Sequence, residues 1–377
     1  MKAIKVRIYP DDEQTEMIAK TIGCCRFVYN WALAKRIAFY QSNKKTLGKF
    51  VIMGELIGLK REKEWLNDVP SQSLQQSVDD LDSAFSHFFR KNNSFPRFKS
   101  KKNARQSYRV PQGFEVNKIS HYIRLPKLGW LRFIDEFCIP EDAEFRNMTV
   151  SRNGNRYYAS VCYKTPEKRV EQHKVEPDKT IGIDLGITTL ATISDGTKIE
   201  NPRHLKQHED NIRVEQQELS KKKEGTKAYE KQKARVNEAY RKVTDTRRDF
   251  LHKLTTSLVE NQNWTSFCVE DLAVSTMMQN NSTPMSRAIG DAGWRMFRSM
   301  MEYKCRDAGK NLIVIGRFEP SSKTCTCGCV NHTLTLVDRE WTCPVCGVHH
   351  VDRDVLASNN IKRFGLRKEA GQSLLVA

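Results

Sequence analysis

Short apolar runs that end on acidic residues mark the second half of the chain. Residues 181–183 lead into Asp184, and a second β-rich run over 188–193 follows, which predicts a hairpin. Residues 267–269 predict a short buried strand that ends on Glu270. An acidic residue at a strand end is most often a turn residue, so neither carboxylate alone indicates chemistry.

Helical periodicity is clearest in the first hundred residues. Apolar side chains recur at intervals of three and four over residues 74–88, which predicts an amphipathic helix that begins at Pro70. Acidic residues at 11–12 can cap an earlier helix that begins near Glu13. Residues 24–40 predict a second helical segment, whose aromatic side chains we interpret as core packing.

Strand-like alternation occupies residues 1–9 and 110–165. Within the second stretch, Asn153-Gly154-Asn155 separates two alternating runs, which is a strong hairpin signal. The pattern predicts a small β-domain that the N-terminal strand completes. A charged linker over residues 167–179 separates this domain from the one that begins at Thr180.

Between the two acidic strand ends, the sequence favours helix. Residues 203–260 are highly charged, with a predicted break at Gly225. A Ser-, Asn- and Pro-rich loop is expected before a helix over 293–308, and residues 311–316 predict another buried strand.

The charge of the chain indicates a polyanionic partner. Lys and Arg number 63 against 45 Asp and Glu, which gives a formal net charge of +18. Nucleic acid is the first candidate partner, and no apolar run approaches the roughly 20 residues that span a membrane. The N-terminus has no signal-peptide pattern, so we expect an intracellular protein whose 11 cysteines are thiols or metal ligands.

Basic and amide side chains in three places are candidate nucleic-acid contacts. Residues 91–109 interleave basic residues with aromatics, which suits phosphates and stacked bases, although a solvated linker is the alternative. Glutamines on the helix after Pro70 could read base edges or only be solvated. The candidates are Gln72, Gln76, Arg97, Lys99, Lys101, Lys102, Arg247 and Arg248.

A cysteine cluster near the C-terminus predicts structural zinc. Cys343 and Cys346 form a C-x-x-C turn, and about 15 residues earlier the chain offers Cys325, Cys327 and Cys329. Tetrahedral zinc takes two thiolates from each of two tight turns, and four protein ligands leave no open position for catalysis. The first arm is C-x-C-x-C, so either Cys327 or Cys329 could join Cys325; His332 is a weaker substitute.

A third acidic position follows the cysteines. Asp352 and Asp354 precede a predicted helix and could simply cap it. However, strand ends on one sheet edge place side chains together, so Asp184, Glu270 and Asp354 can converge. Clustered carboxylates repel one another unless a cation neutralises them, and oxygen ligands select Mg²⁺ or Mn²⁺. Two such ions can clamp the oxygens of a phosphodiester, so this pattern in a basic chain is typical of a nuclease.

At this point the motifs resemble TnpB, the transposon-encoded OrfB family that is similar to the type V CRISPR nucleases. The resemblance extends over nearly the whole chain. It is carried by KVRIYP, IGCCRFVYNWAL, VPSQSLQQSVDDLDSAF, SFPRFKSKK, GIDLGI, VEDL, SSKTC, WTCPVCG and DRDVLASNNI.

The resemblance implies an α+β multidomain protein. It implies a β-barrel wedge domain over residues 1–10 and 105–175 and a helical recognition domain over 11–104. An RNase H-like (RuvC) nuclease domain over 180–320 and 351–377 would be interrupted by a zinc ribbon over 321–350. By motif match the catalytic triad is Asp184, Glu270 and Asp354, holding Mg²⁺ or Mn²⁺.

The chain departs from the family pattern at two positions. Val351 stands between His350 and Asp352, where the family usually reads H-D-R-D, and Leu356 replaces the usual Asn. Neither removes a carboxylate. The insertion leaves the choice between Asp352 and Asp354 open, and we favour Asp354 because its spacing to the closing helix fits the family.

The leading hypothesis from the resemblance is an RNA-guided DNA endonuclease that cuts beside a short adjacent motif. Its partners would be a guide RNA from the transposon end and double-stranded target DNA. We expect a monomer in the cytoplasm, associated with the nucleoid. The alternatives are an RNA-guided repressor that binds without cutting and an accessory transposase protein.

Overall fold

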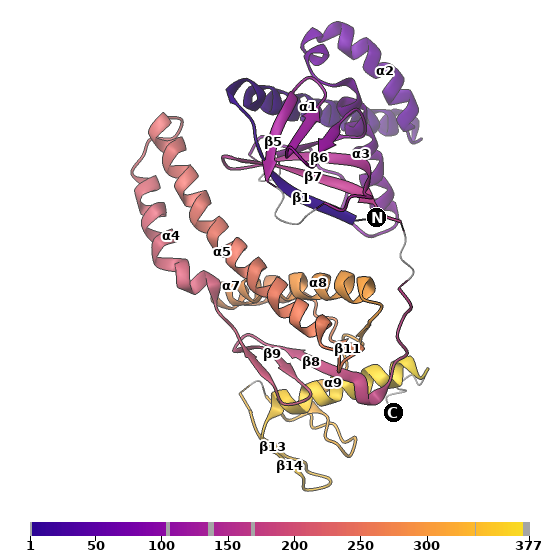
Figure 1. Ribbon diagram of the computed structural model, residues 1–377, viewed down its shortest axis with the longest axis vertical. Helices are drawn as coiled ribbons and strands as arrows, with labels where there is room; N and C mark the ends of the chain where they lie inside the picture. The colour runs from indigo at the N-terminus through magenta and orange to yellow at the C-terminus, as the bar shows by residue number, and fades with distance from the viewer. Residues whose placement is uncertain (1, 103–105, 135–138, 167–169, 336, 372–377) are drawn as a thin grey trace. The chain divides into compact units, whose positions relative to one another are not determined.

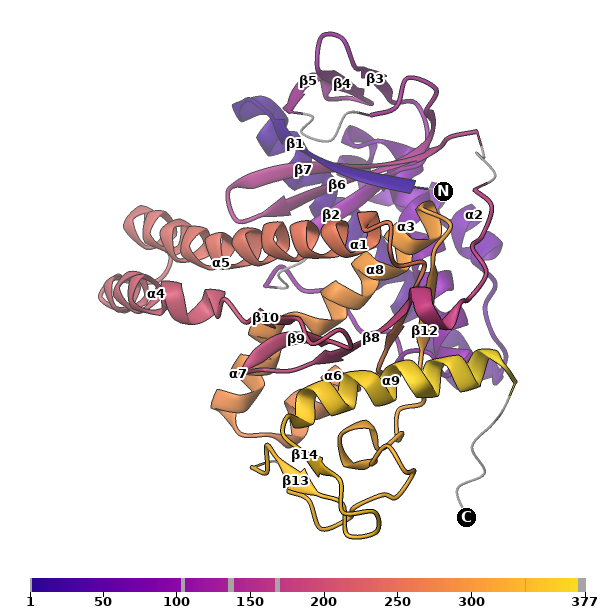
Figure 2. The same cartoon turned by 60° about the horizontal axis from the view of Figure 1, so that its bottom comes forward.

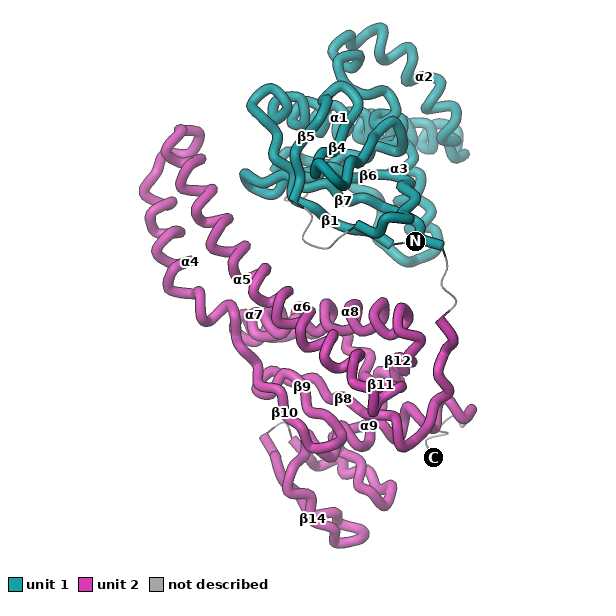
Figure 3. The backbone as a smooth tube through the Cα atoms, viewed as in Figure 1, with its two compact units in different colours: residues 1–168 teal, residues 169–377 magenta. Residues whose placement is uncertain are grey.

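The computed structural model divides into two compact units, residues 1–168 and 169–377 (Figure 3). It describes residues 2–102, 106–134, 139–166, 170–335 and 337–371. The first part of the predicted linker, residues 167–169, therefore lies outside the described residues. None of the described helices has the length and apolar character needed to cross a membrane.

The first unit is a seven-stranded antiparallel sheet packed against helices (Figure 1). The predicted N-terminal strand is confirmed: β1 lies inside the sheet, paired with β7 on one side and β5 on the other. The strand order is β2-β6-β7-β1-β5-β4-β3, and closure into a barrel stays a prediction. The strands are β1 (Lys2–Tyr9), β2 (Gln106–Val110), β3 (Glu115–Asn117), β4 (Tyr122–Leu125), β5 (Gly129–Ile134), β6 (Glu144–Asn153) and β7 (Arg156–Lys164).

The hairpin predicted at Asn153-Gly154-Asn155 joins β6 to β7. Asn153 pairs with Arg156, and Gly154 has a φ of 61°, a left-handed conformation that glycine adopts without strain.

The helices of this unit share the sheet's hydrophobic core. The two helical segments predicted over residues 13–40 are one helix, because no proline interrupts the pattern and Gly23 is tolerated inside it. Asp11 caps this helix through a capping box with Gln14. The helix expected after Pro70 is confirmed, with Leu74 among its buried residues. The helices are α1 (Asp12–Asn43), α2 (Lys49–Glu62) and α3 (Ser71–Phe89).

The second unit is built on a five-stranded mixed sheet with the order β10-β9-β8-β11-β12. The first three strands are antiparallel, and β11 and β12 run parallel to β8. The predicted hairpin and both predicted buried strands are therefore confirmed. The strands are β8 (Thr180–Leu185), β9 (Thr189–Ile193), β10 (Lys198–Glu200), β11 (Ser266–Val269) and β12 (Asn311–Val314).

Helices cover both faces of this sheet (Figure 2). Side chains alternate along a strand, so Phe267 and Val269 pack with α5, α7 and α8, while Cys268 packs with α9 on the other face. The break predicted at Gly225 separates α4 from α5 and has a φ of 86°. The helices are α4 (His204–Ser220), α5 (Lys227–Glu260), α6 (Val274–Asn280), α7 (Thr283–Ala292), α8 (Trp294–Asp307) and α9 (Arg353–Glu369).

The Ser-, Asn- and Pro-rich segment expected to be a loop forms two short helices, α6 and α7. Pro284 occupies the first turn of α7, where a missing N–H costs nothing, and Gly293 ends the helix in a left-handed conformation. Ile289 buries the apolar face of α7 in the core of the unit. The prediction was wrong because it counted loop-forming residues and overlooked these start and stop signals.

Candidate carboxylate and cysteine sites

Strand alternation directs two of the three predicted acids to one face of the sheet. Ile181 and Ile183 point into the core with α5 and α8, so Gly182 and Asp184 point to the opposite face, where α9 lies. Glu270 comes directly after β11, so continued alternation would place it toward the same face, and its side chain also borders a cavity beside α8. Asp184 lies inside β8, paired with Thr192 of β9, so it is a strand residue and not the turn residue that isolated acids usually are.

Gly182 allows α9 to lie close against β8. A Cβ atom at this position would stand 1.9 Å from the carbonyl oxygen of Ser358 and 2.6 Å from the backbone nitrogen of Lys362. Only glycine permits such an approach of two backbones. One turn before Ser358 stands Asp354, so the contact brings the third acid beside the end of β8.

The pKa of Asp184 reflects its burial and the charges of Glu270 and Asp354 nearby. Burial, followed by the charges of Glu270 and Asp354, raises the pKa of Asp184 to about 8, against a smaller lowering from Arg353. Burial also raises the pKa of Glu270, while a hydrogen bond from the Ser321 hydroxyl lowers it. A carboxylate whose pKa is raised by two neighbouring carboxylates is suited to a divalent cation. Among the described residues, however, the four cysteines discussed below are the only group of three or more candidate ligands whose atoms all lie within 4.8 Å of one another.

Asp352 and Asp354 lie in different positions at the start of α9. Asp352 is the N-cap of α9: its Oδ1 accepts the backbone N–H of Asp354 at 3.0 Å and of Val355 at 3.1 Å, and Lys198 binds its other oxygen. Asp354 lies in the first turn, and its carboxylate has a 3.6 Å contact with Arg339. Val351 is exposed and lies directly before the cap, and α9 begins at Arg353.

Four cysteines meet in the segment between β12 and α9. Sγ of Cys325 lies 3.5 Å from that of Cys346, and Sγ of Cys327 lies 3.7 Å from that of Cys343. Zinc–sulfur bonds of roughly 2.3 Å in a tetrahedron place sulfur atoms just under 4 Å apart, so the cluster could bind zinc. Cys329 is not part of this cluster, so the geometry favours Cys327 as the partner of Cys325 in the first arm, and the zinc ligands stay a prediction.

A histidine supports the cysteine cluster from a small hairpin. Nε2 of His350 lies 3.2 Å from Sγ of Cys325, and its ring packs on Trp341 with 4.7 Å between centroids. These residues come from β13 (Trp341–Thr342) and β14 (His349–His350), which pair with each other. Partners of this kind fix the orientation of metal ligands.

Two polar residues that the sequence did not single out connect the clusters. Asn360 is buried in α9 and donates to the carbonyl oxygens of Ser321 at 2.7 Å and Thr324 at 2.6 Å. In this loop, the Ser321 hydroxyl donates a hydrogen bond to the carboxylate of Glu270, and the loop continues to Cys325. Ser321 lies in the motif SSKTC and Asn360 in the motif DRDVLASNNI. The motifs therefore pointed to both residues, but not to the hydrogen bonds that they make.

The predicted nucleic-acid contacts fall into two groups. Arg247 donates to Asp291 at 2.6 Å in a largely buried ion pair, and Lys99 lies 3.8 Å from the centre of the Tyr29 ring, so both already have protein partners. Gln76 contacts Asp80 at 3.4 Å. The others are at least partly exposed: Gln72, Arg97, Lys101, Lys102 and Arg248.

Three family descriptions match parts of this chain. "Probable transposase" matches residues 160–281, a "Helix-turn-helix domain" matches 1–45, and "Cas12f1-like, TNB domain" matches 294–361. Residues 2–43 form β1 and the single helix α1, rather than two helices joined by a turn.

Relatives cover almost the full length of the chain. A protein of Streptomyces pristinaespiralis named "Putative RNA-guided DNA endonuclease" is 38% identical over 98% of this chain and 90% of its own length. The protein InsQ of Escherichia coli K12, which carries the same description, is 30% identical over 97% of this chain and 92% of its own length. A solved Cas12f1–sgRNA–target DNA complex aligns over 96% of this chain and 98% of its own, at 13% identity and a TM-score of 0.49. The chain therefore belongs to the OrfB transposase family, whose members include TnpB.

Proposed function

We propose that this protein is an RNA-guided DNA endonuclease that depends on Mg²⁺ and cuts target DNA beside a short adjacent motif. The observation that carries the proposal is the convergence of Asp184, Glu270 and Asp354, expressed in the raised pKa of Asp184. The names of its full-length relatives support the RNA-guided function. The antiparallel β10-β9-β8 arrangement, extended by parallel β11 and β12, supports an RNase H-like (RuvC) domain.

The three carboxylates would hold two Mg²⁺ ions, or Mn²⁺ in their place. When bound, the ions supply positive charge to the attacking and leaving oxygens of the phosphodiester. The chain itself contributes position: Gly182 sets the approach of α9, and the Ser321 hydroxyl holds Glu270 as an acceptor. The three side chains are partly buried, which reduces the water around the carboxylates and would strengthen their interaction with a cation.

The cysteine cluster would hold a structural zinc ion. Four thiolates complete a tetrahedron, so this zinc would have no position for substrate. Its role would be to order the segment before α9, and Asn360 ties that segment to the helix that carries Asp354.

The net charge of +18 supports binding to a guide RNA and to double-stranded DNA. The first unit, with its antiparallel sheet and helices, would supply the wedge and recognition functions and read the adjacent motif. We propose that the protein acts as a monomer in the cytoplasm.

The test is cleavage of DNA matched to the RNA that co-purifies with the protein. Sequencing that RNA defines the target, and cleavage is measured with and without Mg²⁺. We expect Asp184→Ala to lose at least about 1,000-fold in cleavage rate while RNA binding is retained. Asp195→Ala, an exposed acid in the turn after β9, is the matched control and should cut normally.

Equal cleavage by Asp184→Ala and the wild type would refute the proposed nuclease. RNA-dependent binding without any cleavage by the wild type would instead identify the repressor function. Strand transfer by RNA-free protein would identify a transposase.

A further inference from the structure

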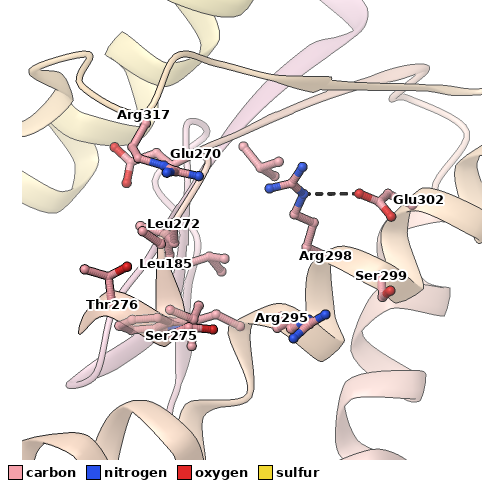
Figure 4. A pocket seen from close by; sticks show the side chains of 14 residues that line it. Leu185, Glu270, Leu272, Ser275, Thr276, Arg295, Arg298, Ser299, Glu302 and Arg317 are labelled. Atoms are coloured by element: carbon pink, nitrogen blue, oxygen red, sulfur yellow. Dashed lines mark hydrogen bonds and ion pairs between the residues drawn. The ribbon is translucent and has the colours of Figure 1, made fainter. Parts of the chain in front are cut away.

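A cavity of about 510 Å³ opens beside the carboxylate site (Figure 4). Glu270 lines it, together with the segment after β11, one side of α8, and Arg317. Its volume lies within the roughly 300–1,000 Å³ typical of sites for small molecules. The carboxylate convergence does not require this cavity, so its lining calls for a separate explanation.

Arginines are concentrated on the wall of this cavity. Arg295 and Arg298 stand one turn apart on α8, and Arg317 follows β12. Asp271, the residue after Glu270, binds Arg298 at 2.6 Å and Arg317 at 2.7 Å, so one carboxylate is shared by two guanidinium groups. Hydrogen bonds from these arginines, with that from Arg298 the strongest influence, lower the pKa of Asp271 and keep it ionised.

Arg295 differs from its neighbours. Glu302 takes a second contact from Arg298 at 3.1 Å, whereas Arg295 has no ion pair within the part of the chain that the structure describes. Its side chain is exposed and lines the cavity. A guanidinium group presents a fork of donors that fits two phosphate oxygens at once.

Another part of the lining is apolar. Leu185 and Leu272 contribute aliphatic surface, and the buried Trp294 donates from its indole N–H to the carbonyl oxygen of Gly186 at 3.2 Å. Of the three acids, Glu270 lines the cavity, so this apolar surface meets the carboxylate site at Glu270. An apolar wall beside an unpaired guanidinium suits a ligand with a phosphate at one end and a flat apolar group at the other.

We propose that this cavity binds the nucleotide next to the scissile phosphate on the DNA strand that is cut, with Arg295 on its phosphate. The inference rests on the proposed endonuclease function and adds a substrate subsite to it. Arg298 and Arg317, fixed by Asp271, form the wall against which the sugar and phosphate lie. Arg295 is thus a residue for substrate binding, distinct from the carboxylates.

The experiment measures cleavage of matched DNA by Arg295→Ala and Arg295→Lys at several salt concentrations. We expect Arg295→Ala to lower kcat/KM by roughly 10- to 100-fold, the effect of losing a hydrogen bond to a charged group. The slope of log kcat/KM against log salt should fall by about 0.7, the contribution of one phosphate on a single strand. Arg295→Lys keeps the charge without the fork and should recover part of the loss.

Arg306→Ala removes an exposed arginine from the other end of the same helix and is the matched control. A second variant, Ser299→Trp, fills the cavity from an exposed position and should lower kcat/KM while RNA binding persists. If the wild type cuts and Arg295→Ala matches Arg306→Ala in both rate and salt slope, the subsite is refuted and the nuclease stands. If the wild type cuts no matched DNA, the nuclease proposal itself fails.

Discussion

The cysteine cluster and the carboxylate cluster lie in the same unit, and they are assembled in opposite ways. The four cysteines come from one short segment, and paired turns bring their sulfur atoms within 4.8 Å of one another. The carboxylates come from β8, the end of β11 and the start of α9, which are far apart in the sequence. Local sequence therefore determines the first cluster, whereas the second exists only when the sheet and α9 have packed together.

The two clusters also differ in what the protein does to their charges. Backbone N–H groups of Cys346 and Val345 help lower the pKa of Cys343 to about 6, which favours the thiolate, the form that a zinc ion would take as a ligand. Burial and like charge raise the pKa of Asp184 to about 8, which disfavours the ionised form until a cation is present. In the cysteine cluster, a hydrogen bond from the Val348 backbone lowers the pKa of Cys346, but hydrogen bonds with neighbouring thiols outweigh it and raise that pKa to about 12, so the sulfur atoms share protons unequally. In the carboxylate cluster, like charges repel one another, and a metal would relieve that repulsion.

The largest expected effect distinguishes the carboxylate that belongs to the cluster from its neighbour. Asp354→Asn should lower Mg²⁺-dependent cleavage at least about 1,000-fold, because it removes one of three carboxylates that share the cation. Asp352→Asn should keep cleavage within a few-fold and cost about 1 kcal/mol of unfolding free energy or less, because asparagine still caps the helix. Cleavage rates and thermal unfolding of both variants provide the measurement, and the reverse result would transfer the role to Asp352.

A second prediction tests the locality of the cysteine cluster. Cys327→Ser should reduce bound zinc from about one ion per chain to nearly none after dialysis, since a hydroxyl is a poor substitute for a thiolate. Cys329→Ser, two residues along the same arm, should keep its zinc because Cys329 lies outside the four. Metal analysis of the purified variants measures this. Zinc loss in Cys329→Ser with retention in Cys327→Ser would exchange the two assignments.

The smallest expected effect is on folding stability, and it comes from repulsion between Asp184 and the neighbouring carboxylates when no metal ion is present. The pKa of Asp184 is about 8 in the folded state, above its ordinary value of 3.8. Between these two pH values, the folded state therefore binds more protons than the unfolded state. In chelator, stability should therefore fall as the pH rises from about 4 to about 8, by an amount on the order of 1 kcal/mol or more. Asp184→Asn should flatten this slope and raise Tm at pH 8 by about 2–4 °C per kcal/mol.

Thermal melts in chelator at several pH values measure this slope, and Mg²⁺ should restore stability to the wild type more than to Asp184→Asn. An identical pH dependence in the two proteins would mean that Asp184 is not under repulsion.

The sequence predicted the elements of the second unit better than their contacts. The hairpin at β8 and β9, the strand β11 and the break at Gly225 were predictable because their apolar periods and turn residues are local. The convergence of Asp184 with Asp354 was expected from the motifs, but the reason for it, the contact between Gly182 and Ser358, depends on packing between distant segments. Periodicity has no means of detecting such a contact.

The same limit explains the side chains whose roles were missed. Arg247 looked like a candidate for phosphate binding because the surrounding sequence is basic, yet Asp291, from α7, binds it in the core. Ser321 and Arg295 carry no distinctive spacing of their own, and their importance appears only from what they lie against. Charge and motif identify which regions matter, while the folded chain determines which atoms meet.

Asp354 lies on α9, the last described helix, and this position has a consequence during synthesis of the protein. Asp184 and Asp354 lie on the order of 170 residues apart in the chain. At a translation rate of roughly 5–20 residues per second, they leave the ribosome roughly 10 to 35 s apart. During that interval the nascent chain already holds β8, but it lacks the helix that packs on Gly182. The carboxylate site is thus absent until α9 has been made, so any cutting would begin only after translation has passed the cysteine segment.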